Sequence, residues 1–463
     1  MALRKWQVDC SDKAISAYNK GQKHFLCLAT PGAGKTRMAA EIAKRLLNSK
    51  EIDYVFCFSP SITTSKDMRF TLENELNVSM MGLLGCKGSC VTYQSLMYKN
   101  AKFWDVFRSH RVFAIFDEIH HCGGNLVENA NVWAMHILMN VKSHATFTLA
   151  LSGTPWRSDN RPVTLSHYSN VDGALQCDFE YGLAEAIEDN VCRTPSVSII
   201  DNNNIGVKDS SGTITNYKSI EDILQSESIS YQSIIETAEI IDFCLEKAIE
   251  KLTSIRIKNP TAAGLIVAST VEHAKIIANK LQCINGDSVQ VVSYKNPDSE
   301  RVIDEFQTSN AQWLVSVGMV SEGTNLPRLQ VCCHLTRIKT ELHFRQILGR
   351  IVRRVDGQKY EKAHLFVPAQ PQIIAYAKRL NEDLPNERVI VSSVLSDKFI
   401  SFDKLNPEFG INDDEILRVV DDSKRQTDAN TLGLNQVTTL LDSFIDGISF
   451  SGKFTSSVVK SAF

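Results

Sequence analysis

The chain has 463 residues, of which 43 % are hydrophobic and 22 % are charged, an ordinary composition for a globular protein of two or three domains. No apolar stretch approaches the roughly 18 residues of a membrane span, and the N-terminus has no apolar signal core, so we expect a cytoplasmic protein without membrane contact. The formal net charge of −3 neither excludes nor supports nucleic-acid binding, because a local basic cleft can bind phosphates in a mildly acidic protein.

Two sets of short apolar runs, with helical patterns between their members, predict two α/β domains in series. Runs of this length without polar alternation are typical of parallel strands that are buried on both faces. The first set comprises residues 25–28, 54–58, 112–116 and 147–151. The second set comprises residues 265–268, 289–292, 313–317, 331–335 and 363–367.

A glycine-rich segment follows the first predicted strand and precedes a helical pattern. Its two glycines allow backbone N–H groups to turn toward phosphate oxygens. Lys35 can reach the β- and γ-phosphates of a nucleotide, and Thr36 can bind Mg²⁺ through its hydroxyl group. An ordinary glycine-rich turn is the alternative. The flanking strand and helix favour a nucleotide-binding P-loop made of Thr30, Pro31, Gly32, Ala33, Gly34, Lys35 and Thr36.

A pair of carboxylates, Asp117 and Glu118, comes directly after the predicted strand at 112–116. At the carboxyl end of a parallel strand, beside a P-loop, Asp117 is placed to coordinate Mg²⁺. Glu118 can then accept a proton from an attacking water molecule. Such a pair is usually a solvated surface feature. Its position after a buried strand favours the catalytic interpretation.

The segment between the two strand sets contains turn-forming residues, followed by an amphipathic helical pattern from Ile234 to Ile255. After residue 368 we find no catalytic or metal-binding pattern. We expect a mostly helical extension there, which either packs on the second domain or docks a protein partner. The expected divisions are 1–165 for the first domain, 166–368 for the linker and second domain, and 369–463 for the extension.

A second charged segment, Gln346-Ile-Leu-Gly-Arg-Ile-Val-Arg353, lies within the second strand set. Arg350 and Arg353 are three residues apart and would project from one face of a helix. Arginines contributed by another element stabilise the charge on a transferred phosphoryl group, which is worth about 10³- to 10⁵-fold in rate in well-studied enzymes. A plain basic helix face is the alternative. Together with the P-loop and the carboxylate pair, the spacing favours a pair of arginine fingers.

With these residues in place, the chain resembles the superfamily 2 helicases and translocases over roughly residues 3–368. The resemblance implies an α/β fold with two tandem RecA-like domains, each with a parallel sheet, that close over ATP and Mg²⁺. The motifs follow the family's order, at residues 4–7, 29–36, 59–61, 91–96, 117–120, 152–157, 265–270, 321–327 and 346–353.

The resemblance also implies how the nucleotide would be bound. Arg4 and Gln7 would read the adenine of ATP. Gly323 and Asn325 would contact the nucleotide from the second domain, although Asn325 stands where many relatives have aspartate. Gln346 would join the arginine fingers and Glu118 in catalysis.

The family's other roles concern movement along a strand. The residues that would couple hydrolysis to the strand are His120, Ser152 and Thr154. The residues that would contact the nucleic-acid backbone are Ser59, Thr92 and Thr270.

Two motifs, at 91–96 and 152–157, look most like the branch that contains XPB, phage UvsW and the motors of type I and type III restriction enzymes. That branch acts mainly on DNA, so the resemblance implies an ATP-dependent DNA helicase or translocase, with DNA favoured over RNA. Three alternatives stay open: a double-stranded DNA motor subunit of a defence or remodelling complex that does not unwind, an RNA helicase, and a protein in which ATP gates the binding of a partner.

Overall fold

The structure is a computed structural model. It describes residues 2–124, 126, 129–157, 161–169, 173–226, 229–286, 288–320, 326–354, 362–380, 382 and 445–459. The chain divides into two compact units. Unit 1 contains residues 1–200, 241–391 and 456–463, and unit 2 contains residues 201–240 and 392–455. Among the described residues, no helix has the length and apolar character needed to cross a membrane.

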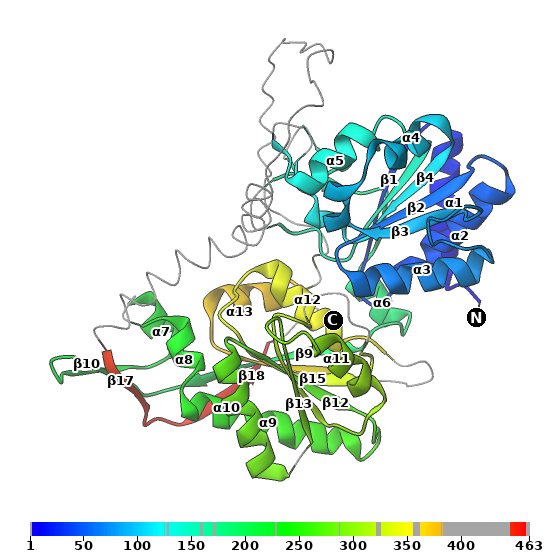
Figure 1. Ribbon diagram of the computed structural model, residues 1–463. Helices are drawn as coiled ribbons and strands as arrows, with labels where there is room; N and C mark the ends of the chain where they lie inside the picture. The colour runs from blue at the N-terminus through cyan, green and yellow to red at the C-terminus, as the bar shows by residue number, and fades with distance from the viewer. Residues whose placement is uncertain are drawn as a thin grey trace. The chain divides into compact units, whose positions relative to one another are not determined.

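The first sheet of unit 1 has six parallel strands in the order β3-β2-β4-β5-β1-β8 (Figure 1). In chain order these strands span His24–Ala29 (β1), Tyr54–Ser59 (β2), Gly88–Thr92 (β3), Val112–Phe116 (β4), Phe147–Ser152 (β5) and Phe179–Tyr181 (β8).

Helices pack on both faces of this sheet, because successive residues of a strand point to opposite sides. Within β1, Phe25 meets Tyr18, with ring centroids 6.2 Å apart, whereas Leu26 belongs to an apolar cluster with Trp104 and Ile137. The helices on the face of Phe25 include α1 (Lys5–Asn19), α2 (Lys35–Asn48) and α3 (Ile62–Leu76), and α2 packs against both α1 and α3. The helices on the face of Leu26 include α4 (Ala101–Ser109), α5 (Val132–Asn140) and the 3-10 helix η1 (Tyr93–Tyr98).

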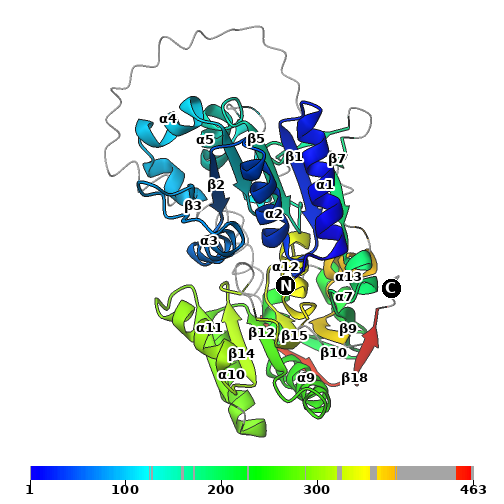
Figure 2. The ribbon, with the colours of Figure 1, turned by 90° about the vertical axis from the view of Figure 1, so that its right-hand side faces the viewer.

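The second sheet of unit 1 has the order β13-β14-β12-β15-β16-β9-β18, and its pairs from β13 to β9 are parallel. Figure 2 labels β14, β12, β15, β9 and β18 of this sheet. Gly264 of β12 lies opposite Trp313 of β14, and a Cβ atom on Gly264 would lie 2.0 Å from the Trp313 ring. Glycine at 264 therefore makes room for this tryptophan. The strands span Thr194–Asn202 (β9), Ala263–Ala268 (β12), Val289–Ser293 (β13), Trp313–Val317 (β14), Leu329–Leu335 (β15), Lys362–Pro368 (β16) and Phe454–Val458 (β18).

Five helices accompany the second sheet in the described part of the chain, and α12 matters most here because it carries Arg350 and ends two residues before Arg353, which the sequence predicts to lie on the same helix. Thr340 begins α12 by accepting a hydrogen bond from the backbone N–H of His343. The helices are α9 (Ala238–Arg256), α10 (Val271–Asn285), α11 (Ser299–Thr308), α12 (Glu341–Ile351) and α13 (Pro371–Lys378).

All nine predicted strands are present, and the two parallel sheets confirm the prediction of an α/β fold with tandem RecA-like domains. Three details differ from the sequence reading. The helical pattern from Ile234 breaks into α8 (Tyr231–Ile235) and α9. Strand β9, which contains Pro195, was not predicted. Strand β8 lies beyond residue 165 and adds to the first sheet through β1.

Unit 2 is built around an antiparallel sheet in the order β11-β10-β17. The extension, expected to be mostly helical, contributes strand β17 (Ile445–Phe450) here, and β18 follows it. Isoleucine and phenylalanine at 445, 448, 450 and 454 favour strands, and Ser451-Gly452 favours a turn. Residues 383–444 of the extension lie outside the described residues. The other elements of unit 2 are β10 (Ile205–Asp209), β11 (Ile214–Tyr217), α7 (Ile220–Gln225) and α8.

Candidate nucleotide-binding site

The register of the first sheet gathers the predicted site residues at one edge. Ser59 ends β2 opposite Thr92 of β3, and Ser152 ends β5 opposite Leu28 of β1. Asp117 follows β4, and the P-loop follows β1. Ligands of open parallel sheets bind at the carboxyl ends of the strands, which is this edge. The sheet therefore brings together residues that are more than 100 positions apart in the sequence.

The P-loop turns through two glycines in the left-handed region, Gly32 at φ 87° and Gly34 at φ 93°. A Cβ atom on Gly34 would lie 2.8 Å from Nε2 of Gln7. Residue 34 is also the N-cap of α2, where backbone N–H groups lack partners within the helix and can face an anion. The backbone conformation therefore requires glycine at this end of the loop, and a side chain there would also displace the Gln7 amide.

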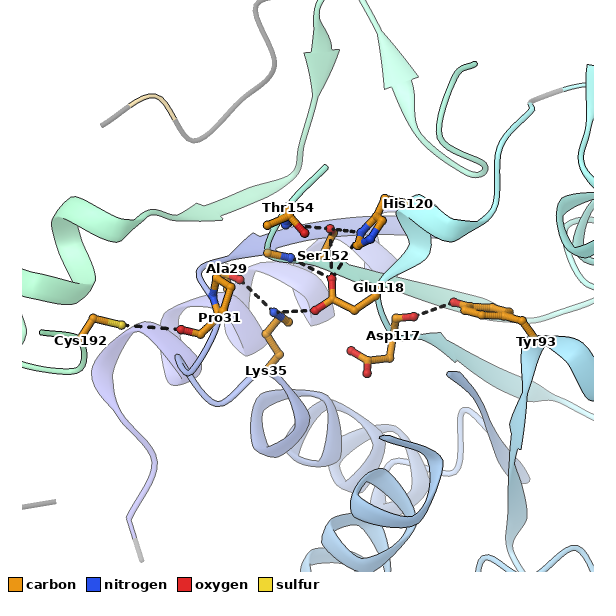
Figure 3. Close-up of polar contacts among 11 residues, drawn as sticks. Ala29, Pro31, Lys35, Tyr93, Asp117, Glu118, His120, Ser152, Thr154 and Cys192 are labelled. Carbon is orange, nitrogen blue, oxygen red and sulfur yellow. Dashed lines mark hydrogen bonds and ion pairs between the residues drawn. The ribbon is translucent and has the colours of Figure 1, made fainter. Parts of the chain in front are cut away.

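Lys35 points from the start of α2 across the sheet edge (Figure 3). Its Nζ lies 3.3 Å from Oε1 of Glu118 and donates to the carbonyl oxygen of Ala29 at 3.1 Å. The two charged side chains are 10 % and 21 % exposed, so their attraction is less screened than that of a surface pair. The pair joins the predicted phosphate-binding lysine to the predicted catalytic carboxylate.

Glu118 adopts a left-handed backbone conformation, φ 49° and ψ 55°, which costs a residue with a side chain about 1–2 kcal/mol. The conformation directs the carboxylate into a polar cluster. Its Oε2 accepts from the backbone N–H of Gly153 at 3.3 Å and the hydroxyl of Ser152 at 3.4 Å, and it lies 3.5 Å from Nδ1 of His120. Strain of this kind concentrates at functional sites.

The predicted coupling residues all belong to this cluster (Figure 3). The Oγ of Ser152 lies 2.9 Å from Nδ1 of His120 and accepts from the backbone N–H of Thr154 at 3.1 Å. A change in the charge or position of Glu118 would therefore reach the segment after β5 directly through the N–H of Gly153 and also through the Ser152 hydroxyl.

Asp117 is anchored through its backbone. Its N–H donates to Phe58 at 2.8 Å, and its carbonyl oxygen accepts from the Tyr93 hydroxyl at 2.8 Å. Its carboxylate points away from the Ser152–His120 cluster (Figure 3). The two adjacent carboxylates thus occupy different positions, as a metal ligand and a general base would need.

The first residues of α1 contact the P-loop backbone. Arg4 donates from Nη1 to the carbonyl oxygen of Ala33 at 2.8 Å, and Gln7 donates from Nε2 to that of Gly34 at 2.9 Å. The backbone N–H of Arg4 donates to Oε1 of Gln7 at 2.8 Å, which fixes the orientation of the amide group. Both predicted adenine-binding residues therefore lie beside the loop.

The end of α12 also lies against the P-loop. A Cβ atom on Gly349 would lie 2.8 Å from Pro31, and one on Gly32 would lie 2.9 Å from Cγ of Arg353. Burial lowers the pKa of Arg353, while nearby acidic groups, Glu118 among them, raise it. Arginine is not deprotonated in proteins, so Arg353 remains a cation at neutral pH. The structure therefore places this positive charge near the P-loop. Gln346 and Arg350 are buried on α12 itself.

Two family models match the two halves of this site. Residues 1–157 match the model of the type III restriction enzyme res subunit, and residues 246–355 match the helicase conserved C-terminal domain. The chain belongs to helicase superfamily 2. These helicase domains imply an ATPase.

The relatives of this helicase-family chain are longer proteins. Uncharacterized proteins of Mycobacterium leprae and Mycobacterium tuberculosis are each 31 % identical to it, over 393 and 398 residues, which are 82 % of this chain and 64 % and 63 % of the relatives. A Schizosaccharomyces pombe protein, provisionally named a mitochondrial ATP-dependent helicase, is 20 % identical over 78 % of this chain and 56 % of its own length. The chain therefore spans less than two thirds of these curated relatives.

Solved structures show the same tandem fold at low sequence identity. An ATP-dependent type ISP restriction-modification enzyme bound to DNA has a TM-score of 0.52 at 14 % identity, covering 82 % of this chain and 30 % of that chain. A fragment from Vibrio vulnificus, provisionally assigned as the HsdR subunit of a type I restriction enzyme, has a TM-score of 0.50 at 16 % identity, covering 79 % and 64 %.

The residues expected to contact a nucleic-acid strand occupy buried or helix-capping positions. Ser59 is fully buried, so its side chain offers no surface to a strand. Thr92 and Thr270 act as N-caps, accepting from the backbone N–H groups of Ser95 at 3.3 Å and His273 at 3.0 Å. Gly323 and Asn325 lie outside the described residues.

Several residues of the helicase site carry no sequence signal of their own. Cys192 lies with Sγ 3.7 Å from the carbonyl oxygen of Pro31. Arg345 places its guanidinium 3.9 Å from the ring centre of Trp156, just after the Ser152–Thr154 segment. Arg193 donates to the backbone around Arg353. The contacts join segments far apart in sequence, so no local pattern indicates them.

Proposed function

We propose that the chain is an ATP-driven DNA motor, a helicase or translocase, that hydrolyses ATP between its P-loop edge and helix α12. The observation that carries the proposal is the Lys35–Glu118 pair, 3.3 Å apart at the carboxyl edge of a RecA-like sheet. A phosphate-binding lysine held against a potential general base is the arrangement that hydrolysis of a nucleoside triphosphate needs.

In this proposal the P-loop, residues 30–36, holds the triphosphate of ATP. Thr36 and Asp117 supply oxygen ligands of the kind that Mg²⁺ prefers. Their positions, at the first turn of α2 and the end of β4, suit a shared ion. When bound, Mg²⁺ neutralises charge on the phosphates. Glu118 accepts the proton of the attacking water, and Lys35 stabilises the phosphate oxygens.

Helix α12 supplies the positive charge that phosphoryl transfer needs. Arg353 is the finger for which the support is strongest, because its side chain lies beside Gly32. Arg350 and Gln346, buried on α12 just before Arg353, complete the set that we propose. Arg4 and Gln7 bind the adenine while they hold the P-loop.

His120, Ser152 and Thr154 couple hydrolysis to movement in this proposal. They share hydrogen bonds with Glu118, so loss of the γ-phosphate changes the electrostatics of their cluster. DNA is the proposed strand, because the first domain matches a restriction-enzyme subunit and a restriction-modification enzyme of the same fold is bound to DNA. The proposal covers both a helicase that unwinds DNA and a translocase that moves along duplex DNA.

The test is the ATPase rate with single-stranded DNA, duplex DNA, forked DNA and RNA, each at 50 and 200 mM salt. We expect DNA to stimulate hydrolysis more than RNA. The apparent affinity should fall steeply with salt, about 10³- to 10⁵-fold if six to ten phosphates are contacted. An ATPase rate that no nucleic acid changes would overturn the motor. Strand-displacement and triplex-displacement assays then separate unwinding from duplex translocation.

A further inference from the structure

Arg193, directly before β9, is a buried cation whose guanidinium donates to four backbone carbonyl oxygens. It is 1 % exposed. Its Nη1 donates to the carbonyl oxygens of Leu329 at 3.0 Å, Ile351 at 3.1 Å and Arg353, and its Nη2 donates to that of Pro327 at 3.1 Å.

The same residue also bonds through its backbone. The N–H of Arg193 donates to the carbonyl oxygen of Val352 at 2.7 Å. Three consecutive carbonyls, 351 to 353, thus accept from one residue. These carbonyls lie where α12 ends, and the last carbonyls of a helix have no partners within it and carry partial negative charge. A buried guanidinium satisfies them and is itself stabilised by them.

We propose that Arg193 is a positioning residue for Arg353. By holding the carbonyls of residues 351–353, it fixes the backbone from which the Arg353 side chain leaves α12 toward Gly32. The remaining bonds, to residues 327 and 329, tie this segment to the start of β15. The inference rests on the proposed finger role of Arg353, which the experiment tests separately.

The chain offers a matched control in Arg328, which also makes carbonyl contacts in the same domain. It is 7 % exposed and donates to the carbonyl oxygens of residues 261, 306, 309 and 311, at 2.6 to 3.1 Å. None of these acceptors belongs to α12 or to the segment after it. A purely structural role predicts that the two arginines behave alike.

The experiment compares Arg193→Lys with Arg328→Lys in the full chain, with melting temperature, ATP affinity and ATPase kcat as readouts. Lysine keeps the charge but loses the fork that reaches several carbonyls at once. Both variants should melt at lower temperature. Only Arg193→Lys should lower kcat, by about 10- to 100-fold, the range expected when a reacting group is displaced by about 1 Å, with ATP affinity within about threefold of the wild type.

A double-mutant cycle gives the decisive result. In an Arg353→Ala background, Arg193→Lys should cause no further loss of kcat, because the group it positions is gone. An equal loss in both backgrounds, or an equal loss in Arg328→Lys, would overturn the inference. If Arg353→Ala itself hydrolyses ATP normally, the finger assignment fails first. If Arg193→Lys does not fold, Arg193→Gln replaces it. Failure of both, while Arg328→Lys folds, would assign Arg193 to folding alone and reject the positioning role.

Discussion

The two halves of the candidate site are held in different ways. In the first half, hydrogen bonds between parallel strands fix the relative positions of residues 29, 117 and 152, because each lies at or just past the end of a paired strand. In the second half, Arg353 lies beyond the last turn of α12, and the Arg193 side chain donates to its backbone carbonyl. Sheet register is set by many bonds, whereas the end of a helix depends on a few. Substitutions in the first half should therefore affect ATP binding and chemistry, and substitutions in the second half should affect chemistry alone.

Arg353→Ala gives the largest expected effect. Loss of an arginine that stabilises the transferred phosphoryl group should lower kcat by about 10³- to 10⁵-fold. ATP binding should stay within a few-fold of the wild type, because the P-loop is unchanged. Steady-state hydrolysis and binding of a fluorescent ATP analogue measure the two quantities. Normal hydrolysis by this variant would show that Arg353 is not an arginine finger.

Glu118→Gln should lower kcat by about 10²- to 10⁴-fold, the usual contribution of a general base. The amide retains the shape of the carboxylate but cannot take the proton of water. It also removes the negative partner of Lys35, so ATP should bind as well as in the wild type or more tightly. A variant that hydrolyses normally would move the role of base to another residue.

Lys35→Ala tests the phosphate-binding residue of the first half of the site. Losing one preorganised cationic donor should lower kcat by about 10²- to 10³-fold. Unlike Arg353→Ala, it should also weaken ATP binding, since the lysine contacts phosphates in the ground state as well. Isothermal titration with ATP and single-turnover hydrolysis report on both. Unchanged ATP affinity would contradict the difference that we expect between the two halves.

The sequence predicts the first half-site well because its signals are local. The P-loop residues are contiguous, and Asp117-Glu118 directly follow a strand that composition alone identifies. By contrast, the groups that accept hydrogen bonds from the Arg193 side chain lie 134 to 160 residues away. They are backbone carbonyls, which every residue type has, so no sequence pattern indicates them. The left-handed conformation of Glu118 likewise depends on tertiary contacts. Unit 2 was missed because β10 pairs with β17, about 240 residues later in the chain.

Trp156→Ala should have the smallest effect of the set, and it examines a contact that joins the two halves. The Arg345 guanidinium lies over the indole ring, and Nε of Arg345 donates to Glu341 at 2.9 Å. Both ring and guanidinium are largely buried, where a cation–π contact is worth up to about 2 kcal/mol. If this contact helps to hold α12 against the segment after β5, its loss should lower kcat by about 2- to 30-fold.

Trp156→Phe is the matched control, because phenylalanine keeps an aromatic face for the guanidinium and should recover most of the activity. Arg345→Met then completes a cycle with Trp156→Ala. Coupling is shown if the double variant loses less kcat than the product of the two single losses, since each substitution removes the same contact. Additive losses would mean that Trp156 and Arg345 act separately. In that case the contacts of α12 and the segment after it with the P-loop would carry more of the connection between the two halves, and Arg193 would matter correspondingly more.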